Sequence, residues 1–234
     1  MIPSPRELRA QPAPARASAP HNLQDQRALD RINQNTELLL RVQGDAELLA
    51  ALQPAGYDAA ALREGQGVCE RALNAFTARQ EAGGAQRTAK SAQDSTAARA
   101  RVEYRAFRSL GRALFKNDPG TLAALGLTDP AATDLQRFVG SAMNGYDAAL
   151  GNPAALSALA RRGFGEQPIT AARALLDTLQ GNNAAHTQAR AAARQATTDR
   201  RAATKAMDDW MAELRAAAVT VLRNSPDMMA RFQS

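Results

Sequence analysis

The amino-acid sequence predicts an all-α protein, a tandem repeat of two similar antiparallel helical bundles that contain long helical hairpins. Hydrophobic residues make up 45% of the chain but aromatic residues only 4%, and much of the hydrophobic share is alanine. Alanine favours helix and buries little area, so this composition suits long, closely packed helices. No stretch alternates apolar and polar residues as a half-buried strand does.

A single offset relates the two halves of the chain. Residues that lie 107 positions apart, such as Pro119 and Pro226, match in size and polarity along most of the sequence without a gap. The matched pairs include Leu52 with Leu159, Gly56 with Gly163, Tyr57 with Phe164, Leu62 with Ile169 and Tyr104 with Met211. The repeat predicts a first copy over residues 23–127 and a second over 128–234, each with three main helices and short capped helices.

Residues 1–22 precede the repeat and contain five prolines among alanine, serine and arginine. Proline fixes φ and removes a backbone donor, and the segment has few large apolar side chains to bury. We therefore predict that residues 1–22 form a disordered Pro/Ala-rich tail.

Each copy is expected to open with an amphipathic helix, near 24–43 in the first copy. A short helix is expected next, near 46–53 and 153–161. Asp45 and Asn152 stand where an N-cap would, and Pro153 suits the first helical position. Glycines suit the C-terminal stops of both short helices and stand at Gly56 and Gly163.

A long helical hairpin is predicted near 58–116 and again near 166–223. Apolar residues recur there at alternating spacings of three and four, which is typical of antiparallel helices packed like a coiled coil. Gly83-Gly84 is the obvious break in the first copy, whereas in the second copy either Gly181-Asn182-Asn183 or Thr197-Thr198-Asp199 could turn. Arms of equal length favour turns near 83–90 and 193–199.

Within residues 23–234, aspartate or serine followed by proline occurs three times and predicts helix starts, because proline is favoured at the first helical position. Asp118-Pro119 and Ser225-Pro226 would open the short helix that closes each copy. Asp129-Pro130 would open the first helix of the second copy.

The run from Phe115 to Leu127, FKNDPGTLAALGL, resembles a phrase in a loose set of uncharacterised bacterial tandem helical-bundle proteins. In those proteins a descending helix ends in an Asp-Pro turn and a Leu-Gly-Leu close, and a second copy follows with a motif like that from Phe138 to Tyr146. The resemblance covers residues 23–234 and implies a tandem helical bundle with no known activity. The second copy departs from the phrase, since residues 228–232 read MMARF, and no functional residue is carried over.

The sequence predicts a protein that is not an enzyme and that uses no metal or other cofactor. Cys69 is the only cysteine, which excludes a disulfide framework and a cysteine-based zinc site. The histidines are His21 and His186, and no glutamate lies three residues before His186 as a di-iron helix pair would require. No serine elbow or phosphate-binding glycine loop is present.

The acidic pairs Asp208-Asp209 and Asp25/Asp30 are interpreted as solvated helix faces. No segment approaches the roughly 18 consecutive apolar residues of a membrane span, so we expect no membrane insertion. Arg6 and Arg9 are followed by no apolar stretch, which argues against a secretory signal and favours a cytoplasmic location.

The formal net charge is +6, and the positive charge gathers around residues 79–105 and 186–205, where the hairpins are expected to turn. If both hairpins point the same way, one end of the protein is basic and could hold phosphates or an acidic partner. The alternative is that arginine and alanine merely keep the hairpin tips helical and soluble. The candidate anion-binding residues are Arg87, Lys90, Arg99, Arg101, Arg190, Arg194, Arg200 and Arg201.

Aromatic residues are expected to cluster at the base of the hairpins, either as ordinary core or as a small-molecule pocket between the copies. They are Tyr57, Tyr104, Phe107, Phe138, Tyr146, Phe164 and Trp210. The leading functional prediction is a non-enzymatic scaffold or adaptor that binds a protein partner or itself. Electrostatic binding of a nucleic-acid backbone through the basic tips is the alternative, and small-molecule binding between the repeats ranks third.

Overall fold

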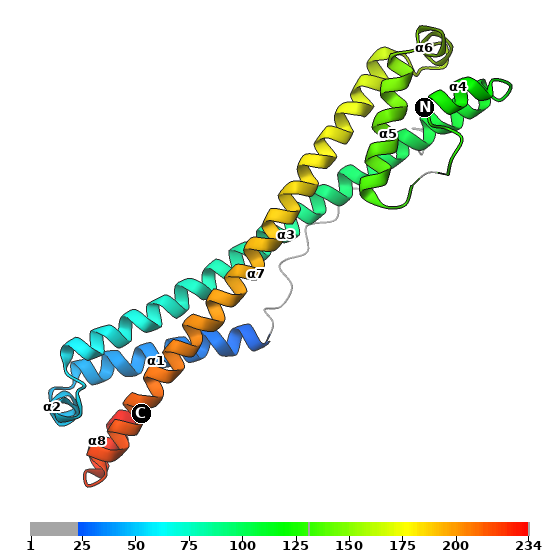
Figure 1. Ribbon diagram of the computed structural model, residues 1–234. Coiled ribbons are helices and arrows are strands. Elements are labelled where there is room, and N and C mark those ends of the chain that lie inside the picture. The colour runs from blue at the N-terminus through cyan, green and yellow to red at the C-terminus, as the bar shows by residue number, and fades with distance from the viewer. Residues whose placement is uncertain (1–22, 131, 234) are drawn as a thin grey trace, which may run out of the picture. The chain divides into compact units, whose positions relative to one another are not determined.

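The computed structural model describes residues 23–130 and 132–233, and all regular structure within those ranges is helical (Figure 1). The elements are α1 (Leu23–Gly44), α2 (Ala46–Leu52), a short 3-10 helix η1 (Gln53–Ala55), α3 (Ala59–Leu114), α4 (Pro119–Ala124), α5 (Leu135–Leu150), α6 (Pro153–Ala160), α7 (Glu166–Leu222) and α8 (Pro226–Gln233). The all-α prediction is therefore confirmed. The tail predicted for residues 1–22 lies outside the described residues.

The short helices begin and end where their capping residues predict. The side chain of Asp45 accepts hydrogen bonds from two backbone amides of α2, each at 3.1 Å, and Asn152 accepts one from α6 at 3.0 Å. Such bonds satisfy amide groups that have no partner in the first helical turn. Gly56 and Gly163 both have φ of 89°, the left-handed conformation that ends a helix at lowest cost on glycine.

The predicted hairpins are wrong. The helix α3 runs without interruption for 56 residues and α7 for 57, so there is no turn near 83–90 or near 193–199. The physical reason is that a glycine inside a helix costs only about 1 kcal/mol relative to alanine. Helix-forming residues on both sides of Gly83-Gly84 can offset that cost, whereas a turn would give up several backbone hydrogen bonds.

The chain forms two compact units, which we describe separately. Unit 1 comprises the chain up to Phe76 together with the chain from Arg200 onward, and unit 2 comprises Thr77–Asp199. The long helices contribute to both, since α3 passes from unit 1 to unit 2 after Phe76 and α7 returns after Asp199. Each unit therefore takes helices from both copies that the sequence repeat predicts.

The core of unit 1 is built from α1, α2, α8, the first part of α3 and the last part of α7. Its fully buried side chains are mostly aliphatic: Leu39, Val42, Leu48, Leu52, Leu62, Met207, Met211 and Leu214. Polar residues also link the helices, since Arg215 of α7 donates to the side-chain oxygen of the buried Asn35 of α1 at 2.6 Å. Aliphatic packing and this buried polar contact together hold α1 against α7.

The core of unit 2 is more aromatic and lies between α5, α6, the second part of α3 and the first part of α7. The rings of Tyr104, Phe107, Phe138 and Tyr146 are buried and contact one another at centroid distances of 5.0–6.1 Å. The small Gly145 of α5 lets the helix approach closely, because a Cβ there would lie 3.1 Å from the carbonyl oxygen of Leu125.

Three arginines on one face of α3 hold the segment between α4 and α5. Arg108 donates to the carbonyls of Gly126 and Asp129, and Arg112 donates to those of Leu127, Thr128 and Asp129 at 2.6–3.1 Å. Arg101 donates to the carbonyls of Ala132 and Thr133 at 3.3 and 2.9 Å. We call Arg101, Arg108 and Arg112 the arginine clamp.

The arginine clamp explains why Asp129-Pro130 does not open a helix. The clamp binds carbonyl groups of the segment before α5, where residues 126–130 and 132–134 form no helix. The helix α5 instead begins at Leu135, where the side chain of Asp134 accepts from the amide of Arg137 at 3.0 Å. The prediction that Asp129 caps α5 is therefore wrong, while Asp118-Pro119 does open α4.

In the part of the chain that the structure describes, no helix combines the length and the hydropathy that crossing a bilayer requires.

Candidate functional site

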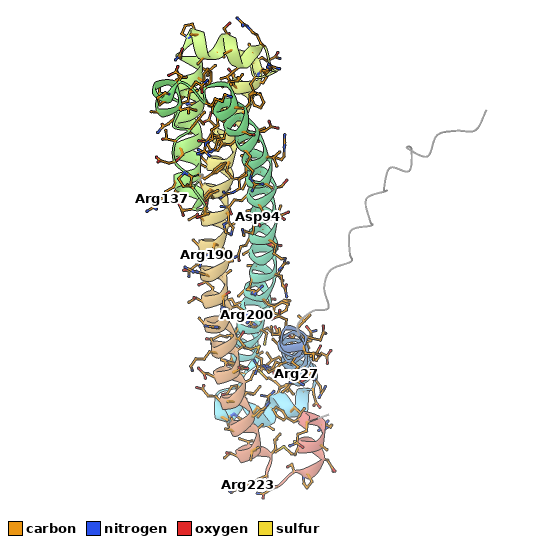
Figure 2. The ribbon with its side chains drawn as sticks, turned by 90° about the vertical axis from the view of Figure 1, so that its right-hand side faces the viewer. Arg27, Asp94, Arg137, Arg190, Arg200 and Arg223 are labelled. Atoms are coloured by element: carbon orange, nitrogen blue, oxygen red, sulfur yellow. The ribbon has the colours of Figure 1, made fainter. Side chains whose placement is uncertain are left out.

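Within unit 2, the two long helices continue beyond the hydrophobic core. The segments 77–96 of α3 and 180–199 of α7 contribute no residue to that core, and neither contains an apolar side chain larger than alanine. We call these two segments the polar span. At the level of Arg190, Figure 2 shows the ribbons of α3 and α7 with no third helix beside them. Around Arg190 the polar span is therefore a two-helix stretch, whereas at its end next to the core Gln180 still contacts Met143 of α5.

The face that packs into the core elsewhere carries charged and polar residues in the polar span. Alternating spacings of three and four continue this face from Ala100 and Ala97 of α3 and from Leu179 of α7. By spacing alone the face continues on α3 through Gln93, Lys90, Gln86, Gly83 and Arg79, and on α7 through Asn183, His186, Arg190, Ala193 and Thr197. In the structure Lys90 and Arg190 are exposed, and the neighbouring Ala89 and Ala189 are half-buried in their place. A coiled-coil seam needs apolar side chains at such positions, so this pair of helices is poorly suited to bury its own seam.

Polar contacts join the two helices at the end of the polar span next to the core. Gln93, which is buried, donates to the side chain of Asn183 at 2.7 Å. Asn182 donates to the hydroxyl of Thr96 at 3.0 Å and to the carbonyl of Ala92 at 3.5 Å. These bonds fix the antiparallel register of α3 and α7 without apolar packing.

A shallow hollow of about 490 Å³ lies along α3 in the polar span. Its lining residues are Arg79, Gly83, Gln86, Arg87, Lys90, Ser91 and Asp94. The guanidinium of Arg79 lies over Gly83, because a Cβ on Gly83 would be 2.8 Å from Nη1 of Arg79. Lys90 pairs with Asp94 of the same helix, and both side chains remain largely exposed.

The candidate cations predicted for hairpin tips instead lie along uninterrupted helices. Arg87, Lys90, Arg99 and Arg101 are on α3, and Arg190, Arg194, Arg200 and Arg201 are on α7. Arg200 and Arg201 belong to unit 1 and the others to unit 2. Within residues 23–130 and 132–233, no ion pair involves Arg87, Arg99, Arg190, Arg194 or Arg201, and all five are exposed.

Two of the candidate cations are bound to the protein itself. Arg101 belongs to the arginine clamp and also lies 4.5 Å above the ring of Phe138. Arg200 forms an ion pair with Asp25 at 2.7 Å, and both side chains are mostly covered. Their guanidinium groups are therefore partly occupied, and the remaining candidate cations are Arg87, Lys90, Arg99, Arg190, Arg194 and Arg201.

The other side chains that could carry out chemistry are either buried in a core or paired with an opposite charge. Cys69 lies in the core of unit 1, where burial raises the pKa of its thiol. Asp208 pairs with Arg31 at 3.3 Å, and Asp209 pairs with Lys205 at 2.5 Å. Over the described ranges, no group of three or more histidine, cysteine, aspartate or glutamate side chains could hold a metal ion.

The aromatic residues that suggested a small-molecule pocket separate into two sets. Tyr57 and Trp210 pack edge to face at 5.7 Å in unit 1. The remaining five, Tyr104, Phe107, Phe138, Tyr146 and Phe164, pack against one another in unit 2. The structure therefore does not bring the full set together, and within each unit the rings contact one another.

The hydroxyl of Tyr146 is a buried polar group with no hydrogen-bond partner among the described residues. Burial raises the pKa of this phenol, and Glu103 and Tyr104 add to the increase. A buried hydroxyl without a partner loses its hydration on folding and regains nothing for it.

We expect the substitution Tyr146→Phe to stabilise the protein by about 1 kcal/mol, because it removes this unsatisfied group and keeps the ring. Urea denaturation measures the change. The matched control is Tyr104→Phe, which removes a hydroxyl that donates to the carbonyl of Ser141 at 3.3 Å. The control should destabilise by about 1 kcal/mol. Equal effects of the two substitutions would contradict the assignment of Tyr146 as unsatisfied.

Sequence reasoning missed the polar-span residues that line the hollow or join the two helices, namely Arg79, Gln93 and the pair Asn182-Asn183. A signal was available, because Arg79 and Gln93 fall on the seam spacing that the apolar residues define on either side. With a turn predicted at Gly83-Gly84, the apolar spacing on one side of the turn was not expected to continue on the other side. Asn182-Asn183 is a candidate turn from sequence, but in the structure both side chains bond to α3 within a continuous helix.

The geometry leaves a two-helix span with exposed cations as the candidate functional site. Comparison of the chain with models of protein families, with curated proteins and with solved structures gives no match.

Proposed function

We propose that the protein is a non-enzymatic helical scaffold whose polar span binds an acidic helical segment of a partner protein. The observation that carries the proposal is the missing third helix. Elsewhere in unit 2, the residues of α3 and α7 pack with α5 around a shared core. In the polar span the corresponding face is polar and half-open, so a helix supplied by a partner would complete the same three-helix arrangement.

Charge indicates the chemistry of that partner. The segments 77–99 of α3 and 180–199 of α7 hold six arginine or lysine residues and three aspartate or glutamate residues. Lys90 and Arg190 are exposed and stand next to the half-buried Ala89 and Ala189, so they lie at the edge of the face between the two helices. A helix that carries glutamate or aspartate would neutralise these cations and bring apolar side chains onto the alanines between them.

We also propose that the two units correspond to each other through the 107-residue sequence repeat. Support comes from element starts that lie 107 positions apart: Ala59 and Glu166 begin α3 and α7, and Pro119 and Pro226 begin α4 and α8. In this proposal, the first part of one copy packs with the last part of the other within each unit. The exchange makes each long helix part of two cores.

Nucleic-acid binding remains the second proposal, because the exposed Arg87, Arg99, Arg190 and Arg194 could contact phosphates. Two observations disfavour it relative to a protein partner. The cations are distributed along helices rather than gathered at a tip, and Lys90 is paired with Asp94. Phosphate-backbone binding would also weaken steeply as salt increases.

Fluorescence anisotropy can separate the two proposals. Two labelled probes are titrated with the full chain at low and high salt: an amphipathic helical peptide with glutamates on one face and leucines on the other, and a short DNA duplex. We expect the acidic peptide to bind and to retain part of its affinity at high salt. The apolar contacts that a third helix makes are not screened by salt, whereas exposed ion pairs are.

The double substitution Lys90→Glu with Arg190→Glu should lower the affinity for the acidic peptide at least tenfold. The control is Arg105→Glu with Arg137→Glu, which makes the same change of charge at exposed positions of unit 2 outside the polar span. An equal loss from both pairs would mean that only net charge matters. If the duplex binds and the acidic peptide does not, the nucleic-acid proposal replaces the scaffold proposal.

A further inference from the structure

A second open hollow, of about 410 Å³, lies in unit 2 between α3 and the first part of α7, outside the polar span. The residues that line it include Arg99 and Glu103 of α3 and Pro168, Ala171, Ala172 and Leu175 of α7. The volume is in the range of sites that hold small ligands. Over residues 23–130 and 132–233, no ion pair involves Arg99 or Glu103, so both charged groups are available to a ligand.

The sequence repeat gives this hollow a counterpart in unit 1. At the offset of 107 positions, Glu103 corresponds to Trp210 and Ala172 corresponds to Gly65. In unit 1 the indole of Trp210 packs directly on Gly65, because a Cβ there would lie 2.4–2.7 Å from three atoms of the ring. Tyr57 packs edge to face on the same indole at 5.7 Å. Unit 1 therefore places its own indole between α3 and α7, at the position that corresponds to the hollow of unit 2.

We propose that the hollow in unit 2 binds a tryptophan side chain of a partner protein, as unit 1 packs its own Trp210. The proposal is independent of the polar span, whose residues do not line this hollow. Unit 1 provides the precedent, because the surface of α3 beside α7 accepts an indole at Gly65. Unit 2 carries Glu103 at the position of that tryptophan, so the ring has to come from another molecule.

The side chains around the hollow match the chemistry of an indole. Ala172 and Leu175 would contact the face of the ring, and the carboxylate of Glu103 would accept a hydrogen bond from the indole N–H. The guanidinium of Arg99 would lie against the ring, and tryptophan is the aromatic side chain that attracts a cation most strongly. A leucine side chain would use neither charged group, so the hollow favours tryptophan over an aliphatic side chain.

The surroundings of the hollow favour a ring that is carried by a polypeptide over a free ring. Ala171, Ala174 and Thr178 of α7 line the hollow and are exposed. The residues that flank the tryptophan in a partner would cover these small side chains. A free ring would leave them in water, so it would bury less apolar area and bind more weakly.

Two differences between the units limit the affinity. The methyl group of Ala172 stands where Gly65 has none, so the ring cannot approach the helix as closely as Trp210 does. Phe164, the counterpart of Tyr57, packs towards Phe107 at 6.4 Å and does not line the hollow. The edge-to-face contact of unit 1 is therefore missing, and we expect a dissociation constant of about 1 mM.

The test uses a short blocked peptide of alanine and glutamine with one central tryptophan, titrated into the ¹⁵N-labelled full chain and followed by NMR. We expect saturable shifts of backbone amides at the residues that line the hollow. The same peptide with leucine in place of tryptophan should cause no saturable shift there. N-acetyltryptophanamide, which carries the ring without flanking residues, should bind about fivefold more weakly.

Three results of these titrations would overturn the proposal. The first is the absence of shifts at the hollow up to the solubility limit of the tryptophan peptide. The second is equal binding of the leucine peptide, which would show that the hollow does not select an indole. The third is equal binding of N-acetyltryptophanamide, which would make the hollow a small-molecule site and not a docking site for a protein.

Two variants test the place and the mode of binding. The double substitution Glu103→Trp with Ala172→Gly introduces the tryptophan–glycine pair of unit 1 and should abolish peptide binding by filling the hollow with the chain's own indole. Ala171→Glu changes only an exposed residue and should weaken binding about fivefold, because it places a carboxylate against the ring. The matched control is Ala184→Glu, at an exposed alanine of the same helix that does not line the hollow. Equal peptide affinities of Ala171→Glu and Ala184→Glu, or unchanged affinity in the folded double variant, would overturn the proposal.

Discussion

Replacing Arg108 with methionine should destabilise the protein by about 3 kcal/mol. Arg108 is only 7% exposed, and its guanidinium donates to the carbonyls of Gly126 and Asp129. The guanidinium also lies 5.6 Å from the centre of the Tyr104 ring, where a cation is favoured. Methionine would fill much of the volume but would remove the bonds to Gly126 and Asp129 and the cation beside the Tyr104 ring, and of the two carbonyls only that of Asp129 keeps a donor, Arg112.

The measurement is thermal unfolding followed by circular dichroism, with an expected decrease in Tm of about 10 °C for a chain of this size. Arg105→Met is the matched control, because Arg105 is an exposed residue on the same helix. The variant Arg108→Lys should fall between the two, since an ammonium group keeps the charge but lacks the planar fork that reaches two carbonyls. Equal Tm values for Arg108→Met and Arg105→Met would show that the arginine clamp does not stabilise the fold.

Much of the helical framework could be predicted because it depends on local chemistry. Caps such as Asp45 and Asn152 act on amides two or three residues away, and Gly56 and Gly163 act through their own backbone conformation. These signals are complete within a few residues of sequence. The starts and ends of the short helices therefore follow from the sequence alone.

The continuous long helices could have been predicted, because the heptad spacing in α3 is stronger evidence than the Gly83-Gly84 pair. Phe76 and Ala97 both lie on the seam of α3 and are separated by a whole number of heptads, so the seam passes through Gly83-Gly84 in phase. If the chain turned at Gly83-Gly84, the two arms would be separate helices, and their heptad positions would not need to stay in register. The periodicity was thus stronger evidence for one helix than the glycines were for a turn.

The arginine clamp and the covered cations could not be predicted, because their partners are distant in sequence. Arg101 bonds to carbonyls that follow α4, and Arg200 bonds to Asp25 in the first helix. Sequence reasoning treats every arginine as an exposed charge until the fold brings a partner to it. Only the recurrence of arginine at Arg108 and Arg215, one repeat apart, hinted at a structural role.

Replacing Gly84 with proline should destabilise the protein by about 3 kcal/mol or more, because proline removes a backbone donor and clashes with the preceding helical turn. Gly84 lies in the middle of α3, and a Cβ there would have no atom within 4 Å outside its own helix. The cost would therefore come from the helical backbone and not from crowding. Urea denaturation gives the change in free energy of unfolding.

The companion substitution Gly84→Ala separates a helix from a turn, because the two structures require opposite results. In a continuous helix, alanine should stabilise by about 1 kcal/mol, since it restricts the unfolded chain and fits the open space around the position. In a turn, proline would be tolerated and alanine would bring no gain. A stabilising alanine with a destabilising proline would establish that the polar span is built on unbroken helices, on which the proposed docking of a third helix depends.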